Sequence, residues 1–339
     1  MQKLKLIFTL VICSFLLNHQ TVNATSSKKG ISVSKDEFIS QMVEQHDFDK
    51  TDLTNVLKQA KKSQTILDAI SRPAEKKLIW HEYRQIFLKD KRINQGVDFM
   101  QKNKAKLDEA QEKYGVPPEI ITAIIGVETF YGRIAGSYRV VDALNTLAFY
   151  YPKRSDFFRS EFEHFLLLAR EQGFDPNSLK GSYAGAMGMP QFISSSYRHY
   201  AIDFDNDDVI DIWNNTDDAI GSVANYFAEH GWLKGKPIIN KVSVEGEEYK
   251  KALKKGLALD INESDLSKYG IKTNSSIEKN EKLKLFEYKL DKGSEYWLAH
   301  KNFYVITRYN HSQLYAMAVY QLSREIKDRF NEKFASSEN

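Results

Sequence analysis

The chain has 339 residues, of which 42% are hydrophobic and 27% are charged, and its formal net charge is +3. A chain of this length exceeds what one hydrophobic core usually supports, so two or three domains are expected. So small a net charge gives no electrostatic case for nucleic acid as a partner.

Residues 1–24 have the pattern of a secretory signal peptide. Two lysines precede the apolar run 6–17, and Val22-Asn23-Ala24 is a small-residue cleavage pattern. The apolar run of about twelve residues is shorter than the roughly twenty that span a bilayer. Cys13, the one cysteine, follows Ile12, whereas bacterial lipoprotein signals usually have a small residue there. A periplasmic protein is therefore favoured over an outer-membrane lipoprotein, although lipidation at Cys13 stays open.

The next segments indicate a flexible lead-in followed by a helical domain. Residues 25–34 are rich in Ser, Lys and Gly, and from residue 35 to 114 apolar residues recur at helical spacing. The last of these helices is predicted over 93–114, with Gly115 as its C-cap. On this pattern alone Trp80 and Tyr83 are more often core residues than ligand contacts, although aromatic rings also pack on sugar faces.

A short apolar helix carries a carboxyl group in an unfavourable environment. Pro117-Pro118 predicts its start, because the first N–H groups of a helix have no partner within it. Glu128 follows three isoleucines by three, four and seven residues, so its carboxyl shares their stripe: Ile125, Ile124 and Ile121. Burial there raises the pKa, and a retained proton makes a general acid. A structural glutamate in a salt bridge remains an alternative.

Two segments after this helix combine aromatic, cationic and glycine residues. The turn 150–154 presents two tyrosines, Lys153 and Arg154, and a helix is predicted over 157–171. Residues 181–193 are rich in glycine, but they lack the spacing and the Lys-Ser/Thr pair of a phosphate loop. These glycines are interpreted as positions where the backbone approaches a bound substrate.

An acidic loop at residues 203–218 has part of the pattern of an EF-hand. Positions 1, 3, 5 and 7 are occupied by Asp203, Asp205, Asp207 and, through its carbonyl, Val209. Position 6 is Asp208 instead of Gly, although Asp tolerates a left-handed turn, and position 12 is Asn214 instead of Glu. Asp218 could close an enlarged loop. The spacing leaves a calcium site and a merely solvated acidic loop equally open.

The C-terminal third changes character. A helix is predicted over 218–231, and the segment 237–306 contains short β-type runs at 238–244, 283–290 and 303–306. This pattern indicates a small β or α+β subdomain. A final helix is predicted over 314–330, with Ser312 as its N-cap.

Several separated stretches together resemble the lytic murein transglycosylase B family, also called glycoside hydrolase family 103. They are residues 115–121, 126–129, 181–188 with 191–192, 218–227 and 307–312. The resemblance implies a mainly α protein, α+β overall, with a lysozyme-like core over 115–236. A helical domain over 35–114 completed by 313–333, a small β subdomain over 237–306 and a cleft-lining segment at 307–312 would surround this core.

The resemblance also implies a reaction. Such enzymes cleave the β-1,4 bond between N-acetylmuramic acid and N-acetylglucosamine in peptidoglycan and leave a 1,6-anhydro ring. Glu128 would act first as acid and then as base. Hydrolysing glycosidases normally need a second carboxylate, and none lies beside Glu128 in the sequence. The alternatives are hydrolysis, as in goose-type lysozymes, and a non-catalytic peptidoglycan-binding scaffold.

Substrate-contact roles carry over from the family to nine residues: Tyr83, Arg154, Phe157, Ser182, Gln191, Tyr226, Tyr309, Asn310 and Tyr315. Arg154 would meet the peptide stem, but its neighbour Lys153 lacks the bidentate fork of an arginine. No cofactor is expected for the chemistry. A structural Ca²⁺ would be held by Asp203, Asp205, Asp207, Val209 and Asp218. The expected partners are glycan strands with their peptide stems and, less directly, murein synthases, and the protein is expected to be a monomer.

Overall fold

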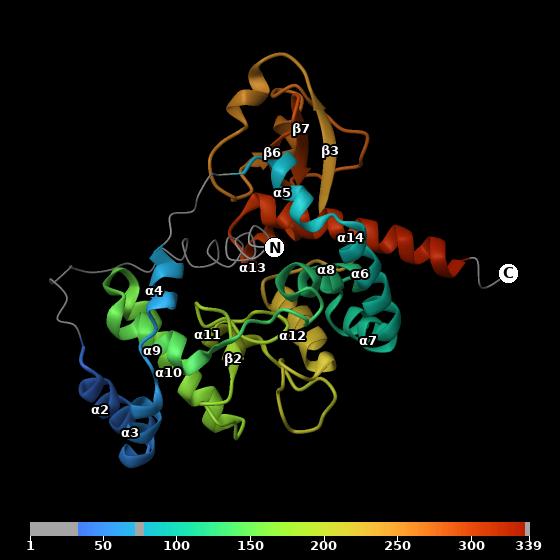
Figure 1. Cartoon of the computed structure of the whole chain (residues 1–339). Helices are drawn as coiled ribbons and strands as arrows, with labels where there is room; N and C mark the ends of the chain where they lie inside the picture. Colours follow the sequence, from blue (N-terminus) through green and yellow to red (C-terminus); the bar gives the residue numbers. More distant parts are fainter. Residues whose placement is uncertain (1–32, 72–77, 336–339) are drawn as a thin grey trace. The chain divides into compact units, whose positions relative to one another are not determined.

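The computed structural model describes residues 33–71 and 78–335, and these residues form two compact units (Figure 1). The first unit contains residues 78–131 and 223–335, and the second contains 33–71 and 132–222. The signal peptide predicted at residues 1–24 lies outside the described residues, as does nearly all of the lead-in. Among the described residues, no helix has the length and apolar character needed to cross a membrane.

The second unit is helical. Its helices are α2 (Lys35–His46), α3 (Lys50–Gln59), α4 (Gln64–Ser71), α9 (Val140–Tyr150), α10 (Ser155–Glu171) and α11 (Ser194–Tyr200). A 3₁₀ turn, η1 (Pro152–Arg154), precedes α10, and β1 (Tyr138–Arg139) pairs with β2 (Lys180–Gly181). Helix α9 packs on α10. Phe38 of α2 contributes to the same core, because its ring stacks on that of Phe162 at 5.4 Å.

The first unit combines helices with a small sheet. Its helices are α5 (Trp80–Phe87), α6 (Asp90–Lys102), α7 (Lys104–Tyr114), α8 (Pro118–Thr129), α13 (Lys301–Tyr309) and α14 (Gln313–Ala335). Helix α12 (Thr216–Glu229) begins in the second unit and ends in the first. The predicted caps are confirmed: Gly115 ends α7 with φ +74°, and the Ser312 hydroxyl accepts the N–H of Tyr315. Helix 93–114 is instead two helices, which meet at Asn103.

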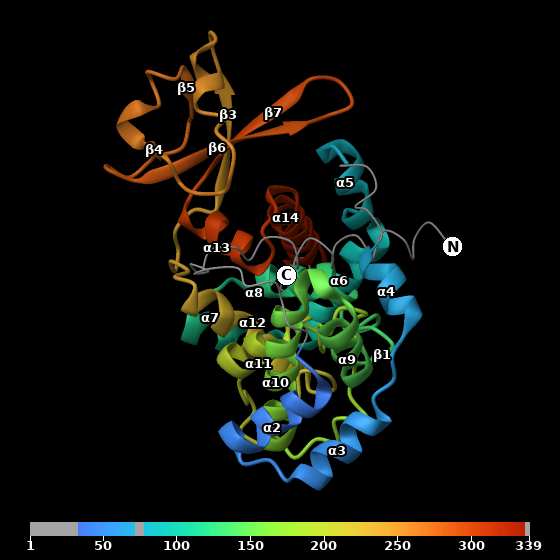
Figure 2. The same ribbon diagram turned by 90° about the vertical axis from the view of Figure 1, so that its left-hand side faces the viewer.

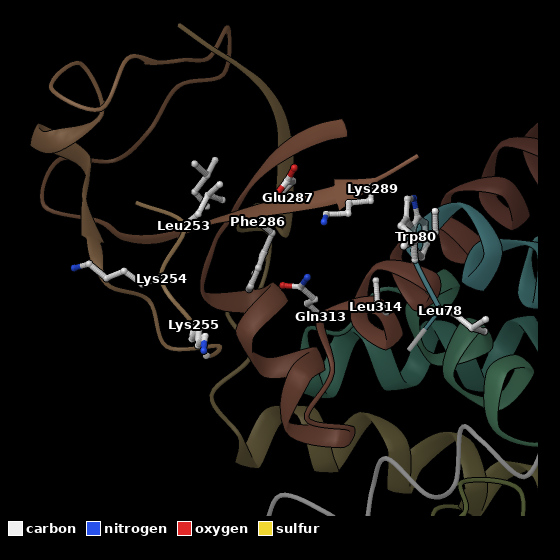
Figure 3. Close-up of a pocket in the computed structure, with 13 residues that line it drawn as sticks. Leu78, Trp80, Leu253, Lys254, Lys255, Phe286, Glu287, Lys289, Gln313 and Leu314 are labelled. Atoms are coloured by element: carbon white, nitrogen blue, oxygen red, sulfur yellow. The ribbon is translucent and has the colours of Figure 1, made fainter. Parts of the chain in front are cut away.

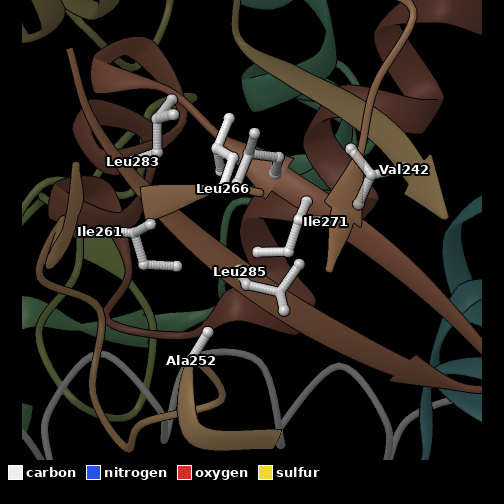
Figure 4. Close-up of a cluster of buried hydrophobic side chains, with 8 residues drawn as sticks. Val242, Ala252, Ile261, Leu266, Ile271, Leu283 and Leu285 are labelled. Atoms are coloured by element: carbon white, nitrogen blue, oxygen red, sulfur yellow. The ribbon is translucent and has the colours of Figure 1, made fainter. Parts of the chain in front are cut away.

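The sheet is antiparallel and has the strand order β4-β6-β7-β3-β5. The strands are β3 (Ile239–Val244), β4 (Ile261–Asn262), β5 (Ile271–Lys272), β6 (Lys282–Lys289) and β7 (Ser294–Ala299), with the 3₁₀ turns η2 (Glu248–Lys251) and η3 (Glu263–Asp265) between them. Leu283 and Leu285 of β6 lie in a hydrophobic cluster with Val242 and Ile261 (Figure 4).

Strand β6 is buried on both faces. The ring of Tyr288 packs against Trp80 of α5 at 5.5 Å, and that of Phe286 packs against Phe303 of α13 at 5.6 Å. Because successive side chains of a strand point to opposite faces, these rings lie on the face opposite to Leu283 and Leu285. This arrangement joins the sheet to α5 and α13 (Figure 2).

One predicted strand is wrong, because residues 303–306 belong to helix α13. Most of this helix is buried, so its apolar residues form a short continuous run, and such a run does not distinguish a buried strand from a buried helix. Strand β7 was not predicted. The mainly α class with a small sheet is confirmed, whereas the domain boundaries drawn from the sequence stay a prediction.

Candidate active site

Glu128 lies in the last turn of α8, a helix whose residues from Glu119 to Thr129 are all buried. The helix starts at Pro118, as predicted. Ile121, Ile124 and Ile125 lie on the same side of this helix as Glu128, and all three are buried. The Glu128 side chain is 6% exposed, and its Oε1 accepts a hydrogen bond of 2.5 Å from the hydroxyl of Tyr315 on α14.

Burial raises the pKa of Glu128 to about 7, and the hydrogen bond from Tyr315 acts in the opposite direction. Burial dominates because the charged form loses its hydration. Glu128 also lies at the C-terminal end of a helix, where the negative end of the helix dipole disfavours a carboxylate. Among the described residues, no second carboxylate contributes to this shift. Glu128 therefore exchanges a proton near neutral pH, which suits a group that acts as acid and as base.

Three buried tyrosines accompany Glu128. The pKa values of Tyr83 on α5, Tyr309 on α13 and Tyr315 on α14 are all raised, first by burial and then by the charge of Glu128. Their hydroxyls therefore remain neutral hydrogen-bond donors near this carboxyl. The first unit thus brings together four of the residues predicted from the sequence.

Tyr226 and Asn310 lie next to this group. The ring of Tyr226 packs against Tyr309 at 4.8 Å and stacks on His230 at 4.0 Å, and its hydroxyl donates to the carbonyl of Arg308. Asn310 is 1% exposed and follows Tyr309 at the end of α13. The Tyr226 ring thus supports the position of Tyr309.

Ser182 and Gln191 lie in one turn of the second unit, and both are buried. The Ser182 hydroxyl accepts from the N–H groups of Ala184 and Ala186. The Gln191 amide donates to the carbonyls of Ala135 and Gly188, and its backbone has φ +54°. These side chains therefore fix the turn itself.

The glycines of this turn are required by the packing of the chain on itself. Their approach to a bound substrate, which the sequence suggested, stays a prediction. Gly185 and Gly188 have φ of +85° and +65°. A Cβ at Gly188 would lie 2.5 Å from the carbonyl oxygen of Ile212, and one at Gly185 would lie 2.7 Å from the Leu144 side chain. The close approaches are thus to protein atoms.

Arg154 and Phe157 form a cation–π pair in the second unit. The Arg154 guanidinium lies 4.1 Å from the centre of the Phe157 ring. Burial raises the pKa of Glu161, whereas its hydrogen bonds with Ser195 and Ser194 and, last, the charge of Arg154 lower it. Both oxygens of Glu161 are occupied, because they accept from the N–H and the hydroxyl of Ser195. Glu161 therefore has a structural role at the start of α11.

The acidic loop brings three of the five predicted ligands together. Oxygens of Asp203, Asp205 and Asp218 lie within 4.8 Å of one another. Two oxygens bound to one Ca²⁺ at 2.3–2.6 Å are at most about 5 Å apart, so this donor set fits the ion. Asp218 is fully buried. Burial raises the pKa of its carboxyl to about 6, although the hydrogen bonds that it accepts from the N–H groups of Phe204 and Asp211 lower the pKa.

The other loop positions serve the turn. The Asp207 carboxylate lies outside the group of three and accepts the N–H of Val209. Asp208 has φ +70°, the left-handed conformation that its place at position 6 predicted. Asp207 and Val209 as metal ligands stay predictions.

The sequence did not reveal the turn that follows Glu128. Phe130 and Tyr131 both have positive φ, of 54° and 62°, which is rare for aromatic residues. The Tyr131 hydroxyl donates to the carbonyl of Arg92, and the Arg92 guanidinium lies 4.9 Å from the centre of the Phe130 ring. The sequence carries no signal for such a turn beyond the glycine that follows it.

The family model described as the transglycosylase SLT domain matches residues 32–324. Over 299 residues the chain is 42% identical to the membrane-bound lytic murein transglycosylase B of Escherichia coli (strain K12). The aligned residues cover 86% of this chain and 81% of that protein.

Solved structures agree with this match. The structure of the soluble lytic transglycosylase SltB1 from Pseudomonas aeruginosa is 51% identical, with a TM-score of 0.84, over 86% of this chain and 98% of that one. The Escherichia coli lytic transglycosylase Slt35 in complex with calcium is 41% identical, with a TM-score of 0.81, over 87% and 93%. SltB3 from Pseudomonas aeruginosa in complex with NAG-NAM-pentapeptide is 28% identical, with a TM-score of 0.77, over 86% and 78%.

These matches confirm the lysozyme-like fold class expected from the sequence. By sequence and by fold, this chain belongs to the lytic murein transglycosylase B enzymes of the SLT domain family.

Proposed function

We propose that this lytic transglycosylase cleaves the β-1,4 bond between N-acetylmuramic acid and N-acetylglucosamine in peptidoglycan and leaves a 1,6-anhydro ring, with Glu128 as its acid and base. The proposal rests on one observation: the buried carboxyl of Glu128 has a pKa near 7 and accepts a hydrogen bond from the neutral hydroxyl of Tyr315. A single group that titrates near neutral pH can run both proton transfers.

The proton transfers balance without water. Protonated Glu128 gives its proton to the glycosidic oxygen as the bond from that oxygen to the anomeric carbon breaks. The resulting carboxylate takes the proton of the sugar's O6 hydroxyl as O6 forms a bond to the same carbon. The hydroxyl of Tyr315 stabilises the carboxylate between the two steps. Because O6 belongs to the substrate, its attack has the advantage of proximity.

The substrate contacts are proposed to be the nine residues that the family resemblance implies. In the first unit they are Tyr83, Tyr226, Tyr309, Asn310 and Tyr315, which lie with or next to Glu128. In the second unit they are Arg154, Phe157, Ser182 and Gln191. Arg154 suits the carboxylates of a peptide stem, and Phe157 suits the face of a sugar ring.

The acidic loop is proposed to hold a structural Ca²⁺ through Asp203, Asp205 and Asp218, with Asp207 and the carbonyl of Val209 as further ligands. Support comes from the cluster of three carboxylates and from the similarity to Slt35, whose structure was solved in complex with calcium. The ion would neutralise the buried charge of Asp218 and would take no part in the chemistry.

The protein is further proposed to act in the periplasm as a monomer, on glycan strands with their peptide stems, and with murein synthases as protein partners. Support for the substrate comes from SltB3, whose structure was solved with NAG-NAM-pentapeptide. Support for the location comes from the signal-peptide pattern and from the membrane-bound relative in Escherichia coli.

The test is digestion of purified sacculi by the wild type and by Glu128→Gln, with mass spectrometry of the released muropeptides. The wild type should release anhydro products, and Glu128→Gln should reduce their release by about 10²-fold or more, because it removes the acid and base. Glu119→Gln is the matched control, since Glu119 is a buried glutamate of the same helix that pairs with Lys327.

Three results would contradict the proposal. Substantial anhydro product from Glu128→Gln would exclude the role of Glu128. Products one water heavier would indicate hydrolysis, as in goose-type lysozymes. Binding to sacculi without any turnover by the wild type would indicate a non-catalytic scaffold.

A further inference from the structure

A pocket in the first unit is lined by none of the residues assigned to substrate contact. Its volume is about 430 Å³, within the range of ligand pockets of roughly 300–1,000 Å³. Strand β6, the segment after η2, and the starts of α5 and α14 line it (Figure 3). Ile79, Trp80, Phe286 and Leu314 contribute apolar walls. The pocket can therefore receive the end of a ligand with aliphatic parts.

The pocket carries an excess of positive charge. Lys254, Lys255 and Lys289 line it, against a single carboxylate, Glu287. The Glu287 carboxylate accepts the hydroxyl of Ser294 at 2.7 Å. Within the described part of the chain, the three lysines form no ion pair. In Figure 3 the Lys289 side chain extends toward Phe286 and Gln313, whereas that of Lys254 points away. Lys289 is thus the cation best placed for a ligand.

Trp80, which lines the pocket, also carries an unused hydrogen-bond donor. Trp80 is 1% exposed, and its indole Nε1–H has no acceptor among the described residues. A buried donor without a partner costs about 1–3 kcal/mol, so such groups are rare in a structure unless a ligand or water accepts from them. The ring itself is held by Tyr288 at 5.5 Å and by Tyr83 at 6.5 Å. The combination of this donor with Lys289 selects for an acceptor that carries negative charge.

We propose that this pocket binds the C-terminal carboxylate of a peptidoglycan stem peptide, with Lys289 and the Trp80 Nε1–H as donors and with Ile79 and Phe286 against the aliphatic side chains. The identity of the ligand rests on the proposed function, since the peptide stems belong to the proposed substrate. The chemistry of the pocket, an apolar cleft with a cation and a neutral donor, matches the end of a short peptide with a free carboxylate.

The location of this pocket gives peptide binding a route to the candidate active site. Trp80 and Tyr83 lie on adjacent turns of α5, and Leu314 directly precedes Tyr315, the donor to Glu128. A stem peptide in the pocket would therefore order two elements that also carry partners of Glu128.

The experiment is an NMR titration of the four tryptophan indole N–H signals of the ¹⁵N-labelled full chain. The probes are a synthetic stem pentapeptide with a free C-terminus and the same peptide with a C-terminal amide. Trp80→Phe identifies the Trp80 signal by its loss. That signal should move downfield with the free acid, because its N–H gains an acceptor, and should stay in place with the amide. The other three signals report that Trp80→Phe is folded.

Charge reversal supplies the matched pair of variants. Lys289→Glu should weaken binding of the free acid at least about tenfold, since it replaces an attractive charge with a repulsive one. Lys268→Glu is the control, because Lys268 is an exposed lysine of the same subdomain that does not line the pocket. It should bind the peptide as the wild type does.

Two outcomes would overturn the proposal. One is a Trp80 indole signal that shifts equally, or not at all, with the peptide acid and the peptide amide. The other is wild-type affinity for the free acid in Lys289→Glu. The result is separable from the proposed function, because the probe has no glycosidic bond. Anhydro products without peptide binding would exclude only the pocket. Peptide binding without anhydro products would exclude only the proposed reaction.

Discussion

Burial and the hydroxyl of Tyr315 act on Glu128 in opposite directions. Burial stabilises the protonated acid, whereas the hydrogen bond from Tyr315 stabilises the carboxylate. Their balance leaves the pKa of Glu128 near 7, below the value that burial alone would give. The proposed reaction needs both forms of this group in turn, so Tyr315 should control the pH range in which the enzyme works.

Tyr315→Phe should therefore raise the pKa of Glu128 further, because burial remains and the stabilising hydrogen bond is lost. In the first step Glu128 must be protonated, so activity falls as the pH rises through its pKa. The alkaline limb of the kcat/KM profile should then move to higher pH. The value of kcat should fall, because the Glu128 carboxylate formed in the first step loses the hydrogen bond from Tyr315. The measurement is release of anhydro products between pH 5 and pH 9.

Tyr288→Phe is the matched control for this profile. Tyr288 is another buried tyrosine of the first unit, but its hydroxyl donates to the backbone carbonyl of Gln313. Its removal should leave the alkaline limb in place. An unchanged limb in Tyr315→Phe, or an equal shift in both variants, would show that Tyr315 does not set the pKa of Glu128.

The burial of Glu128 could be predicted from local spacing, but its partner could not. Three isoleucines at helical spacing place the carboxyl on an apolar stripe, and the structure buries them completely. Tyr315 is 187 residues away along the chain, so no local pattern links the two. The family resemblance named Tyr315 as a substrate contact, and only the fold shows its bond to Glu128.

At the scale of elements, helix α8 is held against α6 by the turn that follows it. Tyr131 lies over two glycines, Gly96 of α6 and Gly126 of α8, and its hydroxyl is fixed by the carbonyl of Arg92. A Cβ at Gly126 would lie 2.7 Å from the Tyr131 ring. Gly126 is therefore needed for close packing, although glycine is unfavourable inside a helix.

Gly126→Ala should destabilise the protein by about 1–3 kcal/mol, because the cost of overpacking exceeds the gain of about 1 kcal/mol in helix propensity. Urea unfolding of the wild type and the variant measures the difference. The control is the same substitution in a Tyr131→Ala background, where the clash is absent and Ala should be neutral or stabilising. Equal destabilisation in both backgrounds would rule out Tyr131 as the cause.

Elements with a clear period or cap were predictable, and those that depend on distant partners were not. The starts and caps at Pro118, Gly115 and Ser312 follow from local hydrogen bonding. Residues 303–306 of α13 have the pattern of a strand because the surroundings of this helix bury most of its residues, which hides the helical period. Strand β7 pairs with both β3 and β6, and neither pairing can be read from the strand itself.

At the scale of the whole molecule, the two units are each built from segments that are far apart in the sequence. Residues 78–131 share a unit with 223–335, and residues 33–71 share one with 132–222. Local patterns cannot reveal such a division, because it depends on which apolar faces meet. The acidic loop lies wholly within the second unit, whose stability it should affect directly.

Calcium should raise the apparent stability of the second unit, because an ion that binds only the folded loop shifts the unfolding equilibrium by mass action. At a concentration of one hundred times Kd the gain is about 2.7 kcal/mol. Calorimetry with added Ca²⁺ or with chelator measures it. A transition that belongs to the second unit should move to higher temperature with Ca²⁺, or the whole transition should move if both units unfold together.

Asp205→Asn should abolish this shift, because it removes the charge of an exposed ligand without disturbing the core. Asp291→Asn is the matched control, since Asp291 is an exposed aspartate in the turn between β6 and β7, outside the loop. It should keep the full calcium shift. If Ca²⁺ does not move the wild-type transition, or if both variants respond alike, the three clustered carboxylates are a solvated acidic loop, the alternative that the sequence left open.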